Sequence, residues 1–167
     1  MVVEWEGKLA LFESTKRPVC NDIIQEKQVS GVQLVWLTEK LPKFCGEIAF
    51  RLLRPSLDQE REKKLYEFID FAMGKPYNDS KYVMVRGKQR RNLQSDHSSF
   101  FCSQLVAEAL QKCGILEDAD RGLASTNYSP ADFSSEGSIS LLENFSYSNE
   151  LIFEQLNLSR ELESVRI

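Results

Sequence analysis

Cys102 is the residue of this chain that is best suited to nucleophilic chemistry, because it lies at the start of a segment with strong helical character. Residues 98–107 read SSFFCSQLVA, and the two serines are expected to cap the helix. Exposed N–H groups and the macrodipole at a helix start favour an anion, and the thiolate is the reactive form of cysteine. The alternative is a small apolar side chain packed on the helix, as we expect for Cys113.

Four further residues carry groups that could serve a thiol site. Glu13 follows a short apolar segment and is either part of the site or a solvated strand end. His97, the single histidine of the chain, precedes Cys102 in the loop that enters the helix; it is either an acid and base or a solvated or capping side chain. Tyr77 and Ser103 are the candidates for substrate binding, although Tyr77 also fits a packing role.

Length and composition describe a globular protein with no obvious cofactor. The chain has 167 residues, of which 42% are hydrophobic and 28% are charged, and its net charge is −4. No apolar run approaches the roughly 18 residues of a membrane span, and the first residues do not resemble a secretory signal. The cysteines have no CxxC spacing, so we expect reduced thiols, a cytoplasmic protein and no metal; they are Cys20, Cys45, Cys102 and Cys113.

The hydrophobic pattern predicts strands first and helices later, which is typical of an α+β domain. Three strands are expected early in the chain, with a polar turn at 14–18 between the first two. A helix with a capping box between Ser56 and Gln59 should end at Gly74, and the Cys102 helix should end at Gly114. The remaining predictions are strands at 8–13, 31–37 and 45–53, a loop at 74–99, a helical turn at 130–133, and a hairpin of 138–142 with 150–156. We expect a single domain over 1–158 and a tail at 159–167.

The segment Arg86–Arg91 carries four positive charges in six residues of an otherwise acidic chain. Such a run is either a solvated loop or a peripheral contact with anionic head groups. No aromatic residues are interleaved with the charges to stack on bases, so the sequence predicts no nucleic-acid partner.

Several short motifs together resemble a known enzyme family. They are LFES at 11–14, GVQL at 31–34, GKPY at 74–77, FCSQLV at 101–106 and YSPADF at 128–133. These stretches look like the circularly permuted papain-like thiol hydrolases of the NlpC superfamily, in the YiiX and poxvirus-type branch. Lecithin:retinol acyltransferase is a more distant relative, and the resemblance covers roughly residues 8–155. It implies a permuted papain-like fold with a small antiparallel sheet packed against helices.

The resemblance also implies roles for individual residues. Cys102 matches the nucleophile and Glu13 matches the polar residue that orients the catalytic histidine. That histidine belongs on a strand before 8–13, and the seven residues before Lys8 contain none, so we expect this chain to lack that strand. A missing strand would leave a sheet edge unpaired and open to a dimer.

The predicted activity is that of a cysteine hydrolase or acyltransferase acting on an amide or ester of a lipid or peptide through a thioester at Cys102. Without the histidine, amides should react slowly, whereas thioesters and activated esters should still react. Two alternatives stay open. One is a catalytically inactive relative that binds a lipid or peptide in the inherited cleft, and the other is an interaction module with a structural cysteine.

Overall fold

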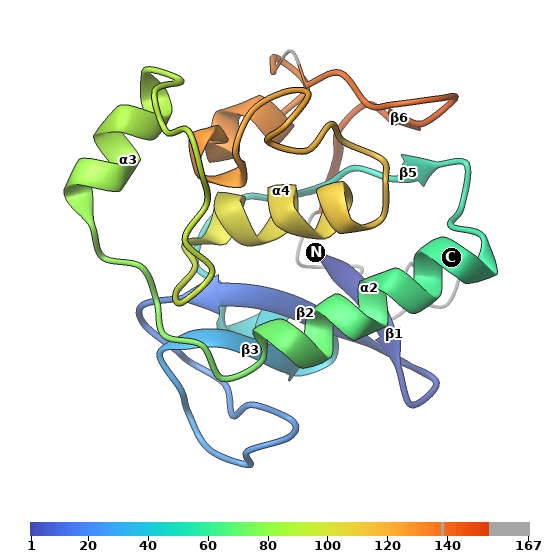
Figure 1. The fold of residues 1–167 in the computed structure, drawn as a ribbon. Helices are drawn as coiled ribbons and strands as arrows, with labels where there is room; N and C mark the ends of the chain where they lie inside the picture. Colours follow the sequence, from blue (N-terminus) through green and yellow to red (C-terminus); the bar gives the residue numbers. More distant parts are fainter. Residues whose placement is uncertain (138, 154–167) are drawn as a thin grey trace.

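A three-stranded antiparallel sheet with two helices packed on it forms the centre of the fold (Figure 1). The computed structural model describes residues 1–137 and 139–153. The strands are β1 (Val2–Trp5), β2 (Lys8–Thr15) and β3 (Gly31–Trp36), in the order β1-β2-β3.

The expectation that no strand precedes Lys8 is wrong, because Val2 pairs opposite Leu11. The polar turn expected at 14–18 starts later, because β2 continues through Thr15. The dimer was predicted from an edge left open by a missing strand; that reason no longer holds, and the dimer itself stays a prediction.

The core lies between the sheet and two helices, α2 (Gln59–Ala72) and α4 (Cys102–Lys112). Side chains of β2 alternate between buried and half-buried, as expected for a strand with one face on a core. Phe12 on this strand meets Phe68 of α2 edge to face, with ring centres 6.2 Å apart, and Phe68 meets Phe100 in the same way at 6.0 Å. This aromatic chain joins β2, α2 and the entrance of α4.

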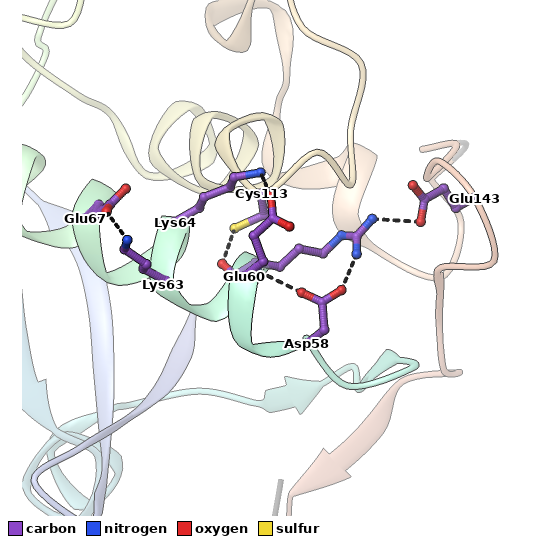
Figure 2. Close-up of polar contacts among 8 residues, drawn as sticks. Asp58, Glu60, Lys63, Lys64, Glu67, Cys113 and Glu143 are labelled. Atoms are coloured by element: carbon purple, nitrogen blue, oxygen red, sulfur yellow. Dashed lines mark hydrogen bonds and ion pairs between the residues drawn. The ribbon is translucent and has the colours of Figure 1, made fainter.

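The first turn of α2 is capped by an aspartate. Asp58 accepts a hydrogen bond from the Arg61 N–H at 2.9 Å, so the expected capping box of Ser56 with Gln59 is wrong. The Arg61 side chain also contacts the Asp58 carboxylate and donates to Glu143 at 2.8 Å. Figure 2 shows Asp58 and Glu143 approaching this position from two parts of the chain. The Arg61 side chain therefore also ties α2 to the loop that precedes β6 (Ser146–Tyr147).

Four short strands form two small sheets away from the central one. β4 (Ile48–Phe50) pairs with β7 (Leu151–Phe153), and β5 (Leu53–Arg54) pairs with β6 (Ser146–Tyr147). The hairpin predicted for 138–142 with 150–156 is therefore wrong: residues 139–142 form no strand, and β7, which lies in the second predicted segment, pairs with β4 instead. The predicted strand 45–53 is divided into two short pieces. Residues 138 and 154–167, which include the predicted tail, lie outside the described residues.

The segment predicted as a long loop contains a helix, α3 (Lys81–Lys88), which Figure 1 shows at the left edge of the view. Ser80 caps it by accepting from the Val83 N–H at 3.3 Å. Sequence periodicity did not indicate this helix because its apolar residues are consecutive (82–85) and do not form one stripe.

Short helical turns complete the described chain. They are α1 (Leu37–Lys40), η1 (Leu41–Lys43), η2 (Ser125–Asn127) and η3 (Pro130–Phe133). The last of these confirms the helical turn predicted at 130–133. Among the described helices, none has the length and apolar character that a bilayer crossing requires.

Candidate active site

Cys102 is the first residue of α4 and is exposed. The residue before it, Phe101, is the N-cap, so the predicted serine cap is wrong. Ser98 instead bonds to Asp96 through its N–H at 2.8 Å and its hydroxyl at 2.9 Å. The first N–H groups of a helix have no partner within it, and phenylalanine has no side-chain oxygen to cap them. The start of α4 therefore presents a thiol beside backbone donors that are not satisfied by the N-cap side chain.

Backbone contacts of Phe100 fix the start of α4. The Ser14 hydroxyl of β2 donates to the Phe100 carbonyl at 2.6 Å, and the Asn78 N–H donates to the same oxygen at 3.0 Å. The Phe100 N–H donates to Pro76 at 3.1 Å, and Tyr77 forms a parallel bridge with Phe100. The sheet and the turn that follows α2 thus hold Cys102 from two directions.

Tyr77 lies close enough to Cys102 for a negative charge on the thiol to affect its phenol. Burial raises the pKa of its phenol, and the negative charges of Cys102 and Asp79 raise that pKa further. The phenol is therefore protonated at neutral pH, and it can act as a hydrogen-bond donor close to the thiol. This position agrees with the substrate-binding role predicted for Tyr77, which stays a prediction.

Glu13 lies on β2 and has partners of its own. Its Oε1 accepts from Lys40 Nζ at 2.5 Å and from Gln33 Nε2 at 2.8 Å, and the pair with Lys40 is mostly shielded from solvent. Burial lowers the pKa of the Met1 amino group to about 6, and the negative charges of Glu13 and Cys102 act in the opposite direction. Glu13 and Cys102 thus both lie near the start of β1, but the Glu13 carboxylate is held by Lys40 and Gln33.

The His97 side chain contacts Phe100 and Glu108. Its ring stacks on Phe100 with an interplanar angle of 13°, and its Nε2 lies 3.0 Å from Glu108 Oε2, outside hydrogen-bond geometry. Glu108 is six residues further along α4 than Cys102, a rise of about 9 Å. Lys112 also pairs with Glu108, at 3.5 Å. The structure therefore pairs His97 with a buried carboxylate in the middle of α4.

Ser103 is buried and donates to the Tyr128 carbonyl at 2.8 Å. This bond connects the first turn of α4 with the residue that follows η2. The hydroxyl therefore joins two segments of the protein, and the substrate-binding role of Ser103 stays a prediction.

Two surface cavities lie elsewhere on the described part of the molecule. One, of about 370 Å³, lies between the β1–β2 turn and α2 and is lined by residues that include Trp5 and Tyr66. The other, of about 320 Å³, is lined by residues around β6 such as Arg51 and Tyr147. Cys102 lines neither, so the cleft that we expected beside it is not one of these two cavities.

The other cysteines provide internal comparisons for Cys102. Cys45 is also exposed but precedes β4 outside any helix, whereas Cys20 and Cys113 are buried. Cys113 caps the opposite end of α4, and its thiol donates to the Arg61 carbonyl at 3.5 Å, a contact drawn in Figure 2. Burial raises the pKa of the Cys113 thiol to about 11.

The raised pKa of Cys113 gives a testable pH dependence of stability. The folded protein binds the thiol proton more tightly than the unfolded chain, whose thiol has a pKa of 9.0. This contribution to the free energy of unfolding is complete below pH 9 and is lost as the pH rises towards 11, by about 2 kcal/mol. The free energy of unfolding in urea should fall less between pH 8 and pH 10.5 for Cys113→Ala than for the native protein. Equal losses in both proteins would contradict the assignment.

Comparisons of the chain with models of protein families, with curated proteins and with solved structures find no match. Among the described residues, no group of three or more histidine, cysteine, aspartate or glutamate side chains could hold a metal ion. The site therefore has to be judged from its own geometry.

Sequence reasoning missed the residues that organise the site. Lys40 and Ser14 were not identified, although both contact predicted site residues or their neighbours. A signal for Ser14 was present, because it continues the alternation of Ala10 and Phe12 on the buried face of β2. Lys40 had no comparable signal, since its approach to Glu13 depends on the turn from β3 into α1.

Proposed function

We propose that this protein is a cysteine-dependent acyl hydrolase or acyltransferase with Cys102 as its nucleophile. The observation that carries the proposal is the exposed thiol at the first residue of α4, beside a first turn that Phe101 cannot cap through its side chain. The positive end of a helix stabilises a thiolate. The free N–H groups of the first turn can also donate hydrogen bonds to the negatively charged oxygen that forms when a carbonyl reacts.

The reaction follows from these groups. The Cys102 thiolate attacks the carbonyl carbon of the acyl donor, and the carbonyl electron pair moves onto oxygen. N–H groups of the first turn of α4 and the Tyr77 hydroxyl are the donors proposed for that oxyanion. Collapse of the intermediate expels the leaving group as an anion and leaves a Cys102 thioester, which water or another acceptor then cleaves.

The preferred substrates are acyl donors with a good leaving group. The His97 ring lies against Phe100 and Glu108, and the Glu13 carboxylate accepts hydrogen bonds from Lys40 and Gln33. We therefore do not propose either residue as the acid that protonates a poor leaving group such as an amine. Thioesters and activated esters need no such proton, so we propose them as the substrate class, with a lipid or peptide as the acyl part.

We further propose that the fold is a permuted papain-like one, which the motif resemblance supports. A strand with Glu13, a helix that starts at Cys102 and the turn at 130–133 follow each other in the order that this resemblance implies.

The second candidate function is an inactive relative that binds an acyl ligand. It is favoured by the ion pair of Glu13 with Lys40, which leaves the carboxylate without a histidine partner among the described residues.

Acylation by an activated ester tests the proposed function. The native protein is incubated with an excess of an aryl thioester at pH 7, and the acylated cysteine is located by peptide mass spectrometry. We expect labelling at Cys102 at least tenfold faster than at Cys45, because both are exposed but only Cys102 lies at a helix start.

Denatured protein provides the control, because the advantage of Cys102 should disappear when α4 unfolds. Equal rates at Cys102 and Cys45 in the folded protein would overturn the nucleophile. Stable acylation of Cys102 without turnover, even with an added acceptor, would favour the inactive relative.

A further inference from the structure

The segment 81–93, which is α3 and the chain that returns from it, presents apolar side chains to solvent. On α3, Tyr82 is 69% exposed and Val85 is 55% exposed, and these residues are one helical turn apart. Leu93, on the returning chain, is 85% exposed. The Asn92 side chain donates to the Val83 carbonyl at 3.0 Å, so the returning chain runs back along α3. The exposed residues therefore belong to one structural unit.

The same unit concentrates positive charge. Residues 81–93 hold five of the chain's 21 basic residues and none of its 25 acidic residues. Arg86 donates to Tyr82 and to the Arg91 carbonyl, and Arg90 pairs with Asp132. Three further basic side chains make no ion pair with any residue that the structure describes, and they are Lys81, Lys88 and Arg91.

Packing holds this unit in place on the protein. Gly87 is buried, and a Cβ at this position would lie 2.2 Å from the Thr126 carbonyl oxygen, so only glycine permits the contact of α3 with η2. The Asn127 side chain holds the Asn92 backbone: its Oδ1 accepts from the Asn92 N–H at 3.0 Å, and its Nδ2 donates to the Asn92 carbonyl at 2.8 Å. The exposed apolar and basic side chains are therefore presented by a fixed support, which lowers the entropy cost of binding.

We propose that α3 and the chain that returns from it, residues 81–93, form a docking surface for anionic lipid bilayers. Aliphatic and aromatic side chains can enter the boundary between head groups and acyl chains, while unpaired cations attract the lipid phosphates. A nucleic acid is a poorer fit, because Tyr82 is the one exposed aromatic residue of the unit and the Arg86 guanidinium lies 5.5 Å over its ring. The net charge of the whole chain is −4, so the attraction is local to this unit.

The experiment is co-sedimentation of the full chain with vesicles of phosphatidylcholine alone or with 30% phosphatidylserine. We expect binding to the anionic vesicles, weakening as salt is raised from 50 to 300 mM. The double variant Lys88→Glu with Arg91→Glu should bind at least 20-fold more weakly, since each basic residue contributes roughly a factor of five at such a surface. Leu93→Ser should weaken binding about tenfold through its lost apolar contact.

Matched variants separate a local surface from a general effect of charge. Lys27→Glu with Lys43→Glu makes the same change in net charge at exposed positions outside the unit, and Ile24→Ser removes an exposed aliphatic side chain elsewhere. These controls should change vesicle binding less than twofold. Equal weakening by both charge pairs, or equal binding to both vesicle types, would overturn the proposal.

A single-stranded RNA oligonucleotide is tested in parallel. Binding of RNA that is lost in the Lys88→Glu, Arg91→Glu variant, together with no binding to vesicles, would also overturn the proposal. The Cys102→Ala variant should bind vesicles like the native protein, so failure of the acyl-transfer proposal leaves this test unaffected.

Discussion

Replacing Cys102 with alanine is expected to lower acyl transfer from an aryl ester on the order of 10³-fold or more, with little change in stability. The substitution removes the proposed nucleophile, and the remaining groups can only hold the ester near water. The side chain is exposed and makes no hydrogen bond to the residues that the structure describes, so the free energy of unfolding should change by less than about 0.5 kcal/mol. Release of the phenol measures the rate, and urea unfolding measures the stability.

Cys45→Ala is the matched control, because it removes the other exposed thiol. Its turnover should equal that of the native protein. If Cys102→Ala retained most of the activity, the nucleophile would be assigned to the wrong residue. If it unfolded the protein, the cysteine would have the structural role that we considered from the sequence.

Replacing Gly31 with alanine is expected to destabilise the protein by about 3 kcal/mol or more. Gly31 begins β3 with a φ of +129°, a region that L residues rarely adopt. A Cβ there would lie 2.2 Å from the Lys75 carbonyl oxygen, which accepts the Val32 N–H at 2.9 Å. Backbone strain and this clash should both contribute to the lost stability. Chemical denaturation measures the effect.

Gly7→Ala separates the two contributions. Gly7 also has a positive φ, of +74°, but its added Cβ would meet nothing within 4 Å. It should cost about 1 kcal/mol, from backbone strain alone. A cost for Gly31→Ala no larger than that of Gly7→Ala would show that the turn at Lys75 can move. Acylation of Cys102 should slow only in the Gly31 variant, because that turn leads into Tyr77 and its bridge with Phe100.

The strongly patterned elements of the fold could be predicted from the sequence. The strands at Lys8 and Gly31, the helix that ends before Gly74 and the helix that starts at Cys102 are confirmed. Each has a clear period or a glycine at its end. The hairpin near the end of the chain was not correctly predicted, because the pairing of two- and three-residue strands depends on distant partners.

The candidate site was predictable in its residues but not in their contacts. The position of Cys102 at a helix start follows from local pattern, and the structure confirms it. The pairing of His97 with Glu108 requires the loop before α4 to fold back along that helix, which no local pattern indicates. Catalytic roles for Glu13, Tyr77 and Ser103 stay predictions, as does that of His97.

The bridge between Tyr77 and Phe100 closes the chain between them into a loop whose two ends meet beside Cys102, the nucleophile that we propose. Closing a longer or shorter loop changes the entropy cost only slowly with length. A change in the length of this loop should therefore alter the entropy cost of closing it only slightly. On the two proposals made above, the membrane affinity of residues 81–93 can vary while the residues around Cys102 stay the same.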